Sequence, residues 1–256
     1  MKYPFIISLP HCSKQVPEEV RPTFDLSNKE IWESTDRGTK EIFGSIPAKK
    51  IIFARWSRLV VDLNRSPTRQ SAKGVIPQVD YHGRFIYRSG CIPDENEKKR
   101  RLKEYYWPFH KRLVEVFEKT DSKVLFDCHS LNGTGPEAAP DFGMKRKDII
   151  LGNNGDHSGN INPSRGGITC PVKTLQLMRE AFERAGYSVS LNDPYPGGFI
   201  TNYYGTKFAS AGKIVVQIEI NQDLYVERTR KRLSPKRLEN VKIRVLQSFK
   251  EIASTL

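Results

Sequence analysis

The sequence predicts an α/β fold in one domain over residues 1–256, with a mixed, mostly parallel sheet flanked by helices on both faces. Apolar runs of strand length alternate along the chain with segments of helical periodicity. Hydrophobic residues make up 38% of the 256 residues, which is enough for a sizeable core. No repeat, low-complexity tract or Ser/Gly-rich linker divides the chain, so we expect a single domain.

The first predicted elements alternate between strand and helix. Residues 3–9 form an apolar run that predicts a buried strand. Residues 28–43 have helical periodicity, and Ser27 directly before them can cap the helix by accepting a backbone N–H. Residues 50–54 and 58–62 are short runs rich in β-forming residues, and both predict strands.

The centre of the chain is expected to hold the longest helical stretch. Residues 93–119 have a helical pattern, but Pro108 should kink or divide the helix, because proline lacks the backbone N–H and clashes with the preceding turn. The apolar runs at residues 123–127 and 148–151 predict two further strands.

The C-terminal part continues the alternation. Residues 172–185 predict a helix that stops at Gly186, since glycine readily adopts the left-handed conformation that ends helices. Residues 187–191 and 213–220 predict strands. Residues 235–252 predict a closing helix that is basic and amphipathic.

The bulk composition limits the classes of function. No run approaches the roughly 18 apolar residues that cross a membrane, and the first apolar run is too short for a signal peptide, so we expect a cytoplasmic protein. The four cysteines are widely separated and predict free thiols. The 42 basic and 29 acidic residues give a net charge of +13, which suits an anionic substrate or a nucleic acid. The basic clusters, including the one at residues 228–237, match no nucleic-acid-binding spacing, so we expect neither a nucleic-acid nor a membrane partner.

Polar residues suited to metal or carboxylate chemistry stand at four of the predicted strands. They are His11, Asp62, Asn64, Arg65, Asp127, His129 and Glu219. In open α/β sheets, sites gather at the carboxyl ends of the strands. One polar strand end means little, but four ends with complementary chemistry predict an active site.

His11 and His129 are the candidate metal ligands, since two of only five histidines stand immediately after predicted strands. A catalytic zinc takes about three protein ligands and leaves one position open. The third ligand is either Asp36, on the predicted helix, or Asp127, which can instead accept a hydrogen bond that orients an imidazole. Asp62 is a second candidate for that orienting role. We predict one zinc ion per chain.

Glu219 and Arg65 suit the hydrolysis of an acidic substrate. A carboxylate on an apolar strand is costly unless it is paired or used, and beside an activated water Glu219 would act as general base. A guanidinium binds a carboxylate through two parallel hydrogen bonds, which makes Asn64 and Arg65 a candidate anchor. The alternatives are a Glu bonded to backbone or to an arginine, and an ordinary surface Arg.

Glycine-rich segments are further candidates for function. Gly197 and Gly198 lack the spacing of a phosphate-binding loop, but adjacent glycines permit a tight turn or close approach of the backbone to a ligand. We include both of them, with Thr201, among the candidate substrate contacts. Residues 66–93 and 130–148 are long loops, and such loops in a compact domain are usually functional or mobile.

An ordered series of motifs resembles the N-formylglutamate amidohydrolase family. The matching pieces are Ser8-Leu9-Pro10-His11, Thr35-Asp36, Val61-Asp62-Leu63-Asn64-Arg65, Tyr106-Trp107-Pro108-Phe109-His110-Lys111-Arg112-Leu113, Phe126-Asp127-Cys128-His129-Ser130, Leu151-Gly152-Asn153-Asn154-Gly155, Pro196-Gly197-Gly198-Phe199-Ile200-Thr201 and Gln217-Ile218-Glu219-Ile220. They leave out only the C-terminal helix. Each piece is weak alone, but the ordered series is specific.

The resemblance implies a zinc carboxypeptidase-like fold and hydrolysis of the amide bond of an N-acyl acidic amino acid such as N-formylglutamate. The Asp-Leu-Asn-Arg piece also resembles the aspartoacylase and carboxypeptidase groups, in which an Asn–Arg pair holds the substrate carboxylate and a glutamate matching Glu219 is the general base. Carboxypeptidases carry a Glu ligand where this chain has Lys14, so the third ligand must come from elsewhere, and we predict Asp36. The family often has Arg where this chain has Asn202, so the acyl or amino-acid preference can differ.

These inferences combine into one predicted mechanism. His11, Asp36 and His129 hold zinc, Glu219 takes a proton from the attacking water, and the Asn–Arg pair fixes the carboxylate of a small acidic substrate. The alternatives are a metallo-carboxypeptidase or amidase acting on small peptides or cell-wall fragments, a family member without activity, and a nucleic-acid-binding protein that uses the +13 charge. The last alternative leaves the four polar strand ends unexplained.

Overall fold

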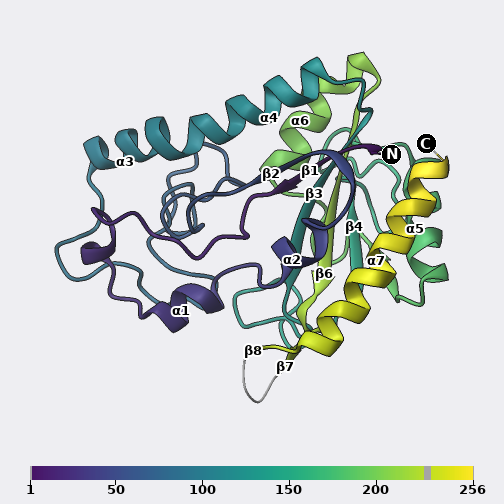
Figure 1. Cartoon of the computed structure of the whole chain (residues 1–256). Helices are drawn as coiled ribbons and strands as arrows, with labels where there is room; N and C mark the ends of the chain where they lie inside the picture. Colours follow the sequence, from purple (N-terminus) through teal and green to yellow (C-terminus); the bar gives the residue numbers. More distant parts are fainter. Residues whose placement is uncertain (1, 228–231, 256) are drawn as a thin grey trace.

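A computed structural model describes residues 2–227 and 232–255 (Figure 1). It contains a six-stranded sheet in the order β2-β1-β3-β6-β4-β5. The strands are β1 (Tyr3–Leu9), β2 (Ala48–Phe53), β3 (Val124–Leu131), β4 (Ile149–Gly152), β5 (Val189–Leu191) and β6 (Ile214–Asn221). Within this sheet, as described, β4 and β6 pair antiparallel and the other four pairings are parallel. The predicted mixed, mostly parallel sheet is confirmed.

Helices cover both faces of the sheet, as predicted (Figure 1). One face packs against α2 (Thr39–Phe43), α5 (Val172–Arg184) and α7 (Pro235–Thr255). The other packs against α4 (Trp107–Lys119) and α6 (Phe199–Phe208). Alternate residues of β1 enter the two cores, with Phe5 and Ile7 on the first face and Ile6 on the second. Because both faces are buried, these strands are apolar runs without a polar alternation.

The helix predicted over residues 28–43 is broken in two, which corrects the expected position of Asp36. Helix α1 (Asn28–Glu33) begins at Ser27 with a capping box, as the sequence suggested, but it ends at Ser34. Helix α2 begins after Gly38, which has φ 77° and packs so closely on Tyr225 that a Cβ would lie 2.6 Å from its ring. Asp36 therefore lies in the irregular segment between the two helices, where it can face the sheet.

The segment at residues 58–62 is not a strand, and that prediction was wrong. Its amides bond within a turn, with Val60 N–H donating to Ser57 O at 2.9 Å. Leu59 and Val60 are buried in a third hydrophobic cluster with Phe24 and Tyr87, away from the sheet. The apolar character of the run therefore reflects loop packing and not strand pairing.

The long predicted helix is interrupted near Pro108. Helix α3 (Glu95–Arg101) passes through a π-helical turn, η2 (Leu102–Tyr106), into α4. Pro108 cannot donate to the carbonyl of Glu104, and the wider turn just before it accommodates this missing bond. The sequence did not predict α6, which begins directly after Gly198.

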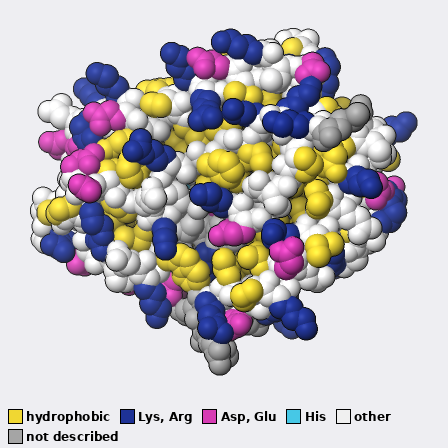
Figure 2. All heavy atoms as spheres, viewed as in Figure 1, with side chains coloured by type: hydrophobic (Ala, Val, Ile, Leu, Met, Phe, Trp, Pro, Cys, Tyr) yellow, Lys and Arg dark blue, Asp and Glu magenta, His cyan; other side chains and the backbone are white. Residues whose placement is uncertain are grey.

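Smaller elements complete the described chain. They are the 3₁₀ turns η1 (Arg21–Thr23), η3 (Ala209–Ala211) and η4 (Gln222–Leu224), and the hairpin of β7 (Val226–Glu227) and β8 (Arg232–Leu233). Part of the predicted basic cluster at residues 228–237, namely residues 228–231, lies outside the described residues. In the described ranges no helix has both the length and the apolar character to cross a membrane. Figure 2 shows basic side chains spread over the viewed face among acidic and apolar ones.

Candidate active site

The carboxyl ends of three adjacent strands bring the candidate residues together. His11 follows β1, while His129 and Glu219 lie opposite each other on β3 and β6. These side chains line a cavity of about 190 Å³ with Asp36, Asn64, Arg65, Gly197 and Gly198. Eight residues predicted for the site therefore share one pocket, although they come from six separate segments of the chain.

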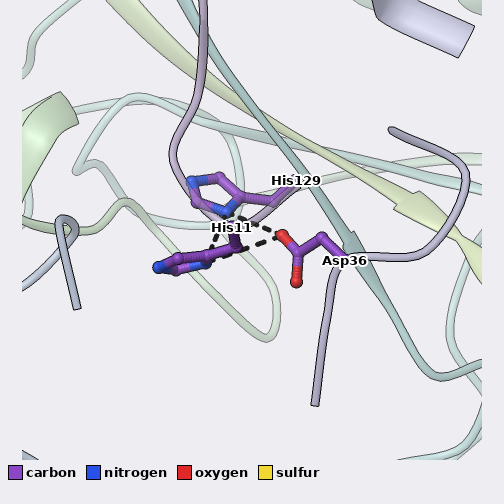
Figure 3. Close-up of side chains that lie close together, drawn as sticks. All are labelled: His11, Asp36 and His129. Atoms are coloured by element: carbon purple, nitrogen blue, oxygen red, sulfur yellow. Dashed lines mark hydrogen bonds and ion pairs between the residues drawn. The ribbon is translucent and has the colours of Figure 1, made fainter. Parts of the chain in front are cut away.

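His11, Asp36 and His129 form a compact buried cluster (Figure 3). The two Nδ1 atoms are 3.2 Å apart, and Asp36 Oδ2 lies 3.0 Å from His129 Nδ1 and 3.6 Å from His11 Nδ1. Two ligands bound about 2.0–2.1 Å from a tetrahedral zinc are about 3.3 Å apart. The three atoms therefore have the spacing of a tetrahedral metal site.

Backbone contacts hold Asp36 in this position. Its N–H donates to the carbonyl of His11 at 3.0 Å, and its own carbonyl accepts from Thr39 Oγ1 at 2.6 Å. Its Oδ2 also accepts from the N–H of Ser130 at 3.2 Å. The break between α1 and α2 is thus tied directly to the ends of β1 and β3.

The other nitrogen of each imidazole is held by a carboxylate. His11 Nε2 lies 2.7 Å from Asp62 Oδ1, and His129 Nε2 lies 3.1 Å from both Asp127 Oδ2 and Asn64 Nδ2. When a neutral histidine donates its Nε2–H to a carboxylate, the lone pair remains on Nδ1. Both Nδ1 lone pairs then point into the same small space beside a carboxylate, which is unfavourable unless a cation lies between them. The donor set fits a metal ion for this reason.

The acids around the cluster favour positive charge there. Burial lowers the pKa of His129, but Asp127 and Asp36 outweigh it and hold that pKa well above its usual value. Burial raises the pKa of Asp36, but hydrogen bonds and charge from the two histidines outweigh it and keep that pKa below its usual range. Burial likewise opposes ionisation of Asp62, and the charges of Arg58 and His11 hold its pKa well below the usual value.

Asp127 and Thr201 lie outside the pocket. Asp127 contacts the side of the His129 ring away from Asp36, which is the position of an orienting acceptor and not of a third ligand. Thr201 has no exposed surface, and its hydroxyl donates to Asp127 Oδ2 at 3.4 Å. The expectation that Thr201 contacts substrate does not fit this placement, since the first turn of α6 buries it behind Asp127.

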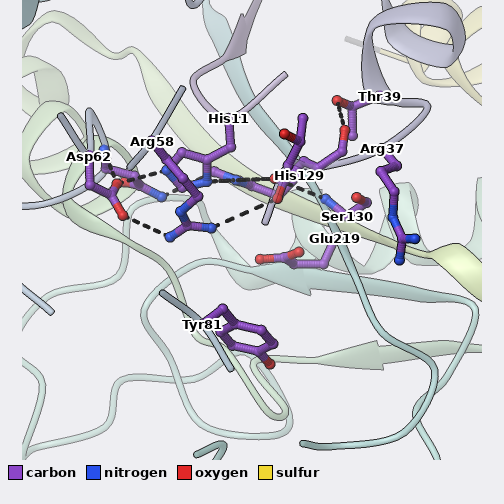
Figure 4. Close-up of polar contacts among 12 residues, drawn as sticks. His11, Arg37, Thr39, Arg58, Asp62, Tyr81, His129, Ser130 and Glu219 are labelled. Carbon is purple, nitrogen blue, oxygen red and sulfur yellow. Dashed lines mark hydrogen bonds and ion pairs between the residues drawn. The ribbon is translucent and has the colours of Figure 1, made fainter. Parts of the chain in front are cut away.

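Arg58 is a pocket residue that the sequence reasoning missed (Figure 4). Its Nη2 donates to Asp62 Oδ2 at 2.7 Å, and its Nη1 lies 3.8 Å from Asp36 Oδ1. It therefore connects the carboxylate that orients His11 with the carboxylate in the cluster. The signal in the sequence was the spacing, since Arg58 stands four residues before Asp62. Two side chains at that spacing can meet in a helical turn, but residues 58–62 were predicted as a strand, so this contact was not predicted.

Glu219 is buried at the edge of the pocket with its carboxylate toward the cavity (Figure 4). Gln217 Nε2 donates to its Oε1 at 3.2 Å. Burial raises its pKa to about 7, and the negative charges of Asp36 and Asp127 add to this effect while His129 and Arg58 oppose it. A carboxylate with a pKa near neutrality can both accept and return a proton at physiological pH.

The Asn64–Arg65 segment is held by contacts from several elements. Asn64 Oδ1 accepts from Ile200 N–H at 2.8 Å, and Tyr106 Oη donates to Arg65 O at 2.9 Å. A Cβ on Gly198 would lie 2.2 Å from Asn64 Nδ2, so this close approach requires glycine. The Nη1 of Arg65 donates to the carbonyl of Asn64, while its buried Nε has no hydrogen-bond partner among the described residues. The Arg65 side chain lines the pocket, and its Nε–H is a buried donor that no described residue satisfies.

These features define an α/β enzyme with a candidate metal centre, a buried glutamate and a pocket-lining arginine at the carboxyl ends of the central strands. The chain belongs to the N-formylglutamate amidohydrolase family, whose model matches residues 3–226. The family resemblance and the enzyme class predicted from the motifs are confirmed. Its relatives are amidohydrolases that act on a C–N bond other than a peptide bond.

Two curated relatives cover most of this chain. It is 28% identical over 242 residues to an N-formylglutamate deformylase of Pseudomonas putida, covering 89% of this chain and 84% of that protein. It is 27% identical over 238 residues to the N-formylglutamate deformylase of Pseudomonas aeruginosa, covering 88% and 83%. The fold is similar to the crystal structure of an N-formylglutamate amidohydrolase from Ralstonia eutropha, with a TM-score of 0.76, 17% identity and coverage of 100% and 96%.

Proposed function

We propose that this chain is a metal-dependent deformylase that hydrolyses the amide bond of N-formylglutamate or a closely similar N-acyl amino acid, releasing formate and the free amino acid. The observation that carries the proposal is the pair of facing Nδ1 atoms, 3.2 Å apart, whose rings are held from behind by Asp62 and Asp127. The two curated deformylases, similar over almost the whole chain, support the choice of reaction.

His11, Asp36 and His129 would hold the metal, and we propose zinc because two imidazoles and one carboxylate in a tetrahedral spacing suit it. Zinc bound there would supply a Lewis acid and would lower the pKa of a water ligand towards neutrality. Asp62 and Asp127 would orient the two imidazole rings with Nδ1 toward the ion.

Glu219 is the proposed general base. It lines the cavity beside the cluster, and its pKa of about 7 lets it take the proton of the attacking water and later return it to the departing amine. Arg58 is the cation nearest to the cluster acids, and it would stabilise the negative charge that develops on the amide oxygen.

Arg65 is the proposed anchor for the α-carboxylate of the substrate. Its guanidinium lines the pocket with a buried Nε–H that lacks a partner in the described part of the chain. A carboxylate bound by this guanidinium would orient the formyl group toward Glu219. Gly198 and Asn64 shape the adjoining wall, since glycine lets the two segments approach closely.

Metal content and turnover of N-formylglutamate test the proposal. Purified wild type is expected to carry about one zinc per chain, and the variant His11→Ala/His129→Ala is expected to carry none. His157→Ala is the matched control, because His157 is exposed in a loop outside the pocket. A folded wild type that takes up no zinc and has no deformylase activity would refute the proposal.

Two further variants separate the roles of base and anchor. Glu219→Gln should lower kcat by about 10²–10⁴-fold while zinc stays bound. Arg65→Ala should mainly raise KM, and Arg65→Lys should not restore it, because an ammonium cannot form the two parallel bonds of a guanidinium. Near-normal turnover in Glu219→Gln would show that the base has been misassigned.

A further inference from the structure

The pocket contains few cations for a site that receives an acidic substrate. Among the described residues that line it, only Arg58 and Arg65 are cationic, while Glu33, Asp36 and Glu219 are acidic. Arg58 is already bonded to Asp62 and lies 3.8 Å from Asp36. Of the described pocket residues, Arg65 is therefore the one guanidinium available for a substrate carboxylate, whereas a dicarboxylic substrate has two carboxylates.

The rest of the pocket wall presents neutral hydrogen-bonding groups. Tyr81 and Tyr195, from two different loops, line the cavity with their hydroxyl oxygens 3.1 Å apart. In Figure 4, Tyr81 lies on the far side of Glu219 from His11. Gln217, Gln222 and Ser130 also belong to this neutral part of the wall.

Arg146 lies one hydrogen bond behind the tyrosine pair. Its Nη2 donates to Tyr195 Oη at 3.2 Å, but its Nε and Nη2 also bind the two oxygens of Asp141 at 2.6 Å each. The bidentate pair with Asp141 neutralises its charge. Arg146 therefore polarises and positions Tyr195 without offering a free positive charge to the pocket.

A hydrogen count leaves one phenol proton unused in this network. Tyr195 Oη accepts from Arg146, and the contact between the two hydroxyls consumes the proton of only one tyrosine. The other O–H has no acceptor in the network just described and can donate to an oxygen in the pocket. Burial raises the pKa of Tyr195 further above its usual value, so the Tyr195 hydroxyl stays protonated.

We propose that the Tyr81–Tyr195 pair, positioned by Arg146, receives the side-chain oxygen of the substrate, and that the chain therefore binds N-formylglutamine nearly as well as N-formylglutamate. Carboxylate and carboxamide oxygens both accept from a phenol. A carboxylate accepts a stronger hydrogen bond than a carboxamide does, but it loses its hydration in a part of the pocket that offers no cation. Because these two effects oppose each other, the two side chains should bind with similar affinity. An apolar side chain leaves the phenol donor unpaired and is disfavoured. This inference rests on the proposed function, and it adds the class of substrate side chain that the pocket accepts.

Binding to a zinc-loaded Glu219→Gln protein tests the pair independently of turnover. Calorimetry with N-formylglutamate, N-formylglutamine and N-formylnorleucine should give affinities within tenfold for the first two and at least tenfold weaker for the third. Adding Tyr81→Phe/Tyr195→Phe should remove most of the preference for polar over apolar side chains. Tyr203→Phe in the same background is the control, because Tyr203 is 48% exposed and lies outside the pocket lining.

Each result decides the question. A preference of more than 100-fold for N-formylglutamate over N-formylglutamine would reveal an unassigned cation and overturn the inference. An equal loss of affinity for all three ligands in the double tyrosine variant would overturn it too, because the pair would then hold the part that they share. The expected affinities without hydrolysis by the wild type would support the tyrosine pair and overturn the proposed reaction instead.

Discussion

Asp62→Asn tests whether the contact behind His11 prepares it as a metal ligand. Asp62 uses one oxygen for His11 Nε2 at 2.7 Å and the other for Arg58 Nη2 at 2.7 Å. An asparagine has one acceptor and one donor in place of two acceptors. If its oxygen faces the histidine, its NH₂ meets the Arg58 donor. If it is turned the other way, its NH₂ takes the Nε2 lone pair and moves the proton to Nδ1, which removes the ligand atom.

The expected loss of zinc affinity follows from that bond. A hydrogen bond to a charged group contributes about 1.5–3 kcal/mol, and about 1.4 kcal/mol is a tenfold change, so zinc should bind about 10- to 150-fold more weakly. Competition with a chromophoric chelator measures this affinity, and circular dichroism checks the fold.

Asp80→Asn is the matched control. Asp80 is a buried carboxylate that also pairs with an arginine, with Oδ2 2.7 Å from Arg84, and accepts the N–H of His82 at 2.8 Å. It does not contact the cluster, so its variant should lose stability but keep zinc affinity within about twofold. Unchanged zinc affinity in Asp62→Asn, or an equal loss in both variants, would contradict the reasoning.

Two further predictions concern Glu219 and Gly198. Glu219→Gln should stabilise the metal-free protein at pH 8 by up to about 3 kcal/mol, because burial raises the carboxyl pKa from 4.5 to about 7. The wild type loses this free energy of unfolding as the pH rises from 4.5 to 7. Urea denaturation should therefore show that Glu219→Gln is more stable than the wild type at pH 8 but not at pH 4. An equal gain in stability at both pH values would contradict the prediction. Gly198→Ala should lower kcat/KM at least tenfold, since its Cβ would lie 2.2 Å from Asn64 Nδ2, whereas Gly167→Ala, with no atom within 4 Å, is the control that should retain activity. Comparable activity in the two alanine variants would show that the wall tolerates displacement of Asn64.

Local sequence patterns were sufficient for the sheet and for the three strands that deliver His11, His129 and Glu219. Buried parallel strands are continuous apolar runs, and a polar residue at the end of such a run is visible without any knowledge of pairing. The adjacency of β1, β3 and β6 then brings these ends together. Helix α6 escaped prediction because its β-branched and aromatic residues have poor helix propensity, and packing of Ile200 and Tyr204 on the sheet stabilises it instead.

The positions of Asp36 and Arg58 could not be predicted because both depend on contacts far along the chain. Asp36 lies outside the predicted helix because Gly38 packs against Tyr225, and this contact joins residues almost two hundred positions apart. Arg58 points into the site because the apolar residues after it pack against Phe24 and Tyr87 and not within the sheet. The pairing of Tyr81 with Tyr195 likewise joins two loops that no local pattern relates.

The charges around the two imidazoles provide a further argument for the proposed metal site. Four carboxylates surround them (Asp36, Asp62, Asp127 and Glu219), and among the described residues the arginines whose charges act on these acids are Arg37, Arg58 and Arg65, so the acids outnumber the guanidiniums. Such an excess is costly in a buried site, because like charges in a low dielectric repel strongly. Protons can offset it, and the raised pKa values of His129 and Glu219 show this tendency. A divalent cation would offset this excess while leaving Glu219 ionised, which is the state that a general base requires.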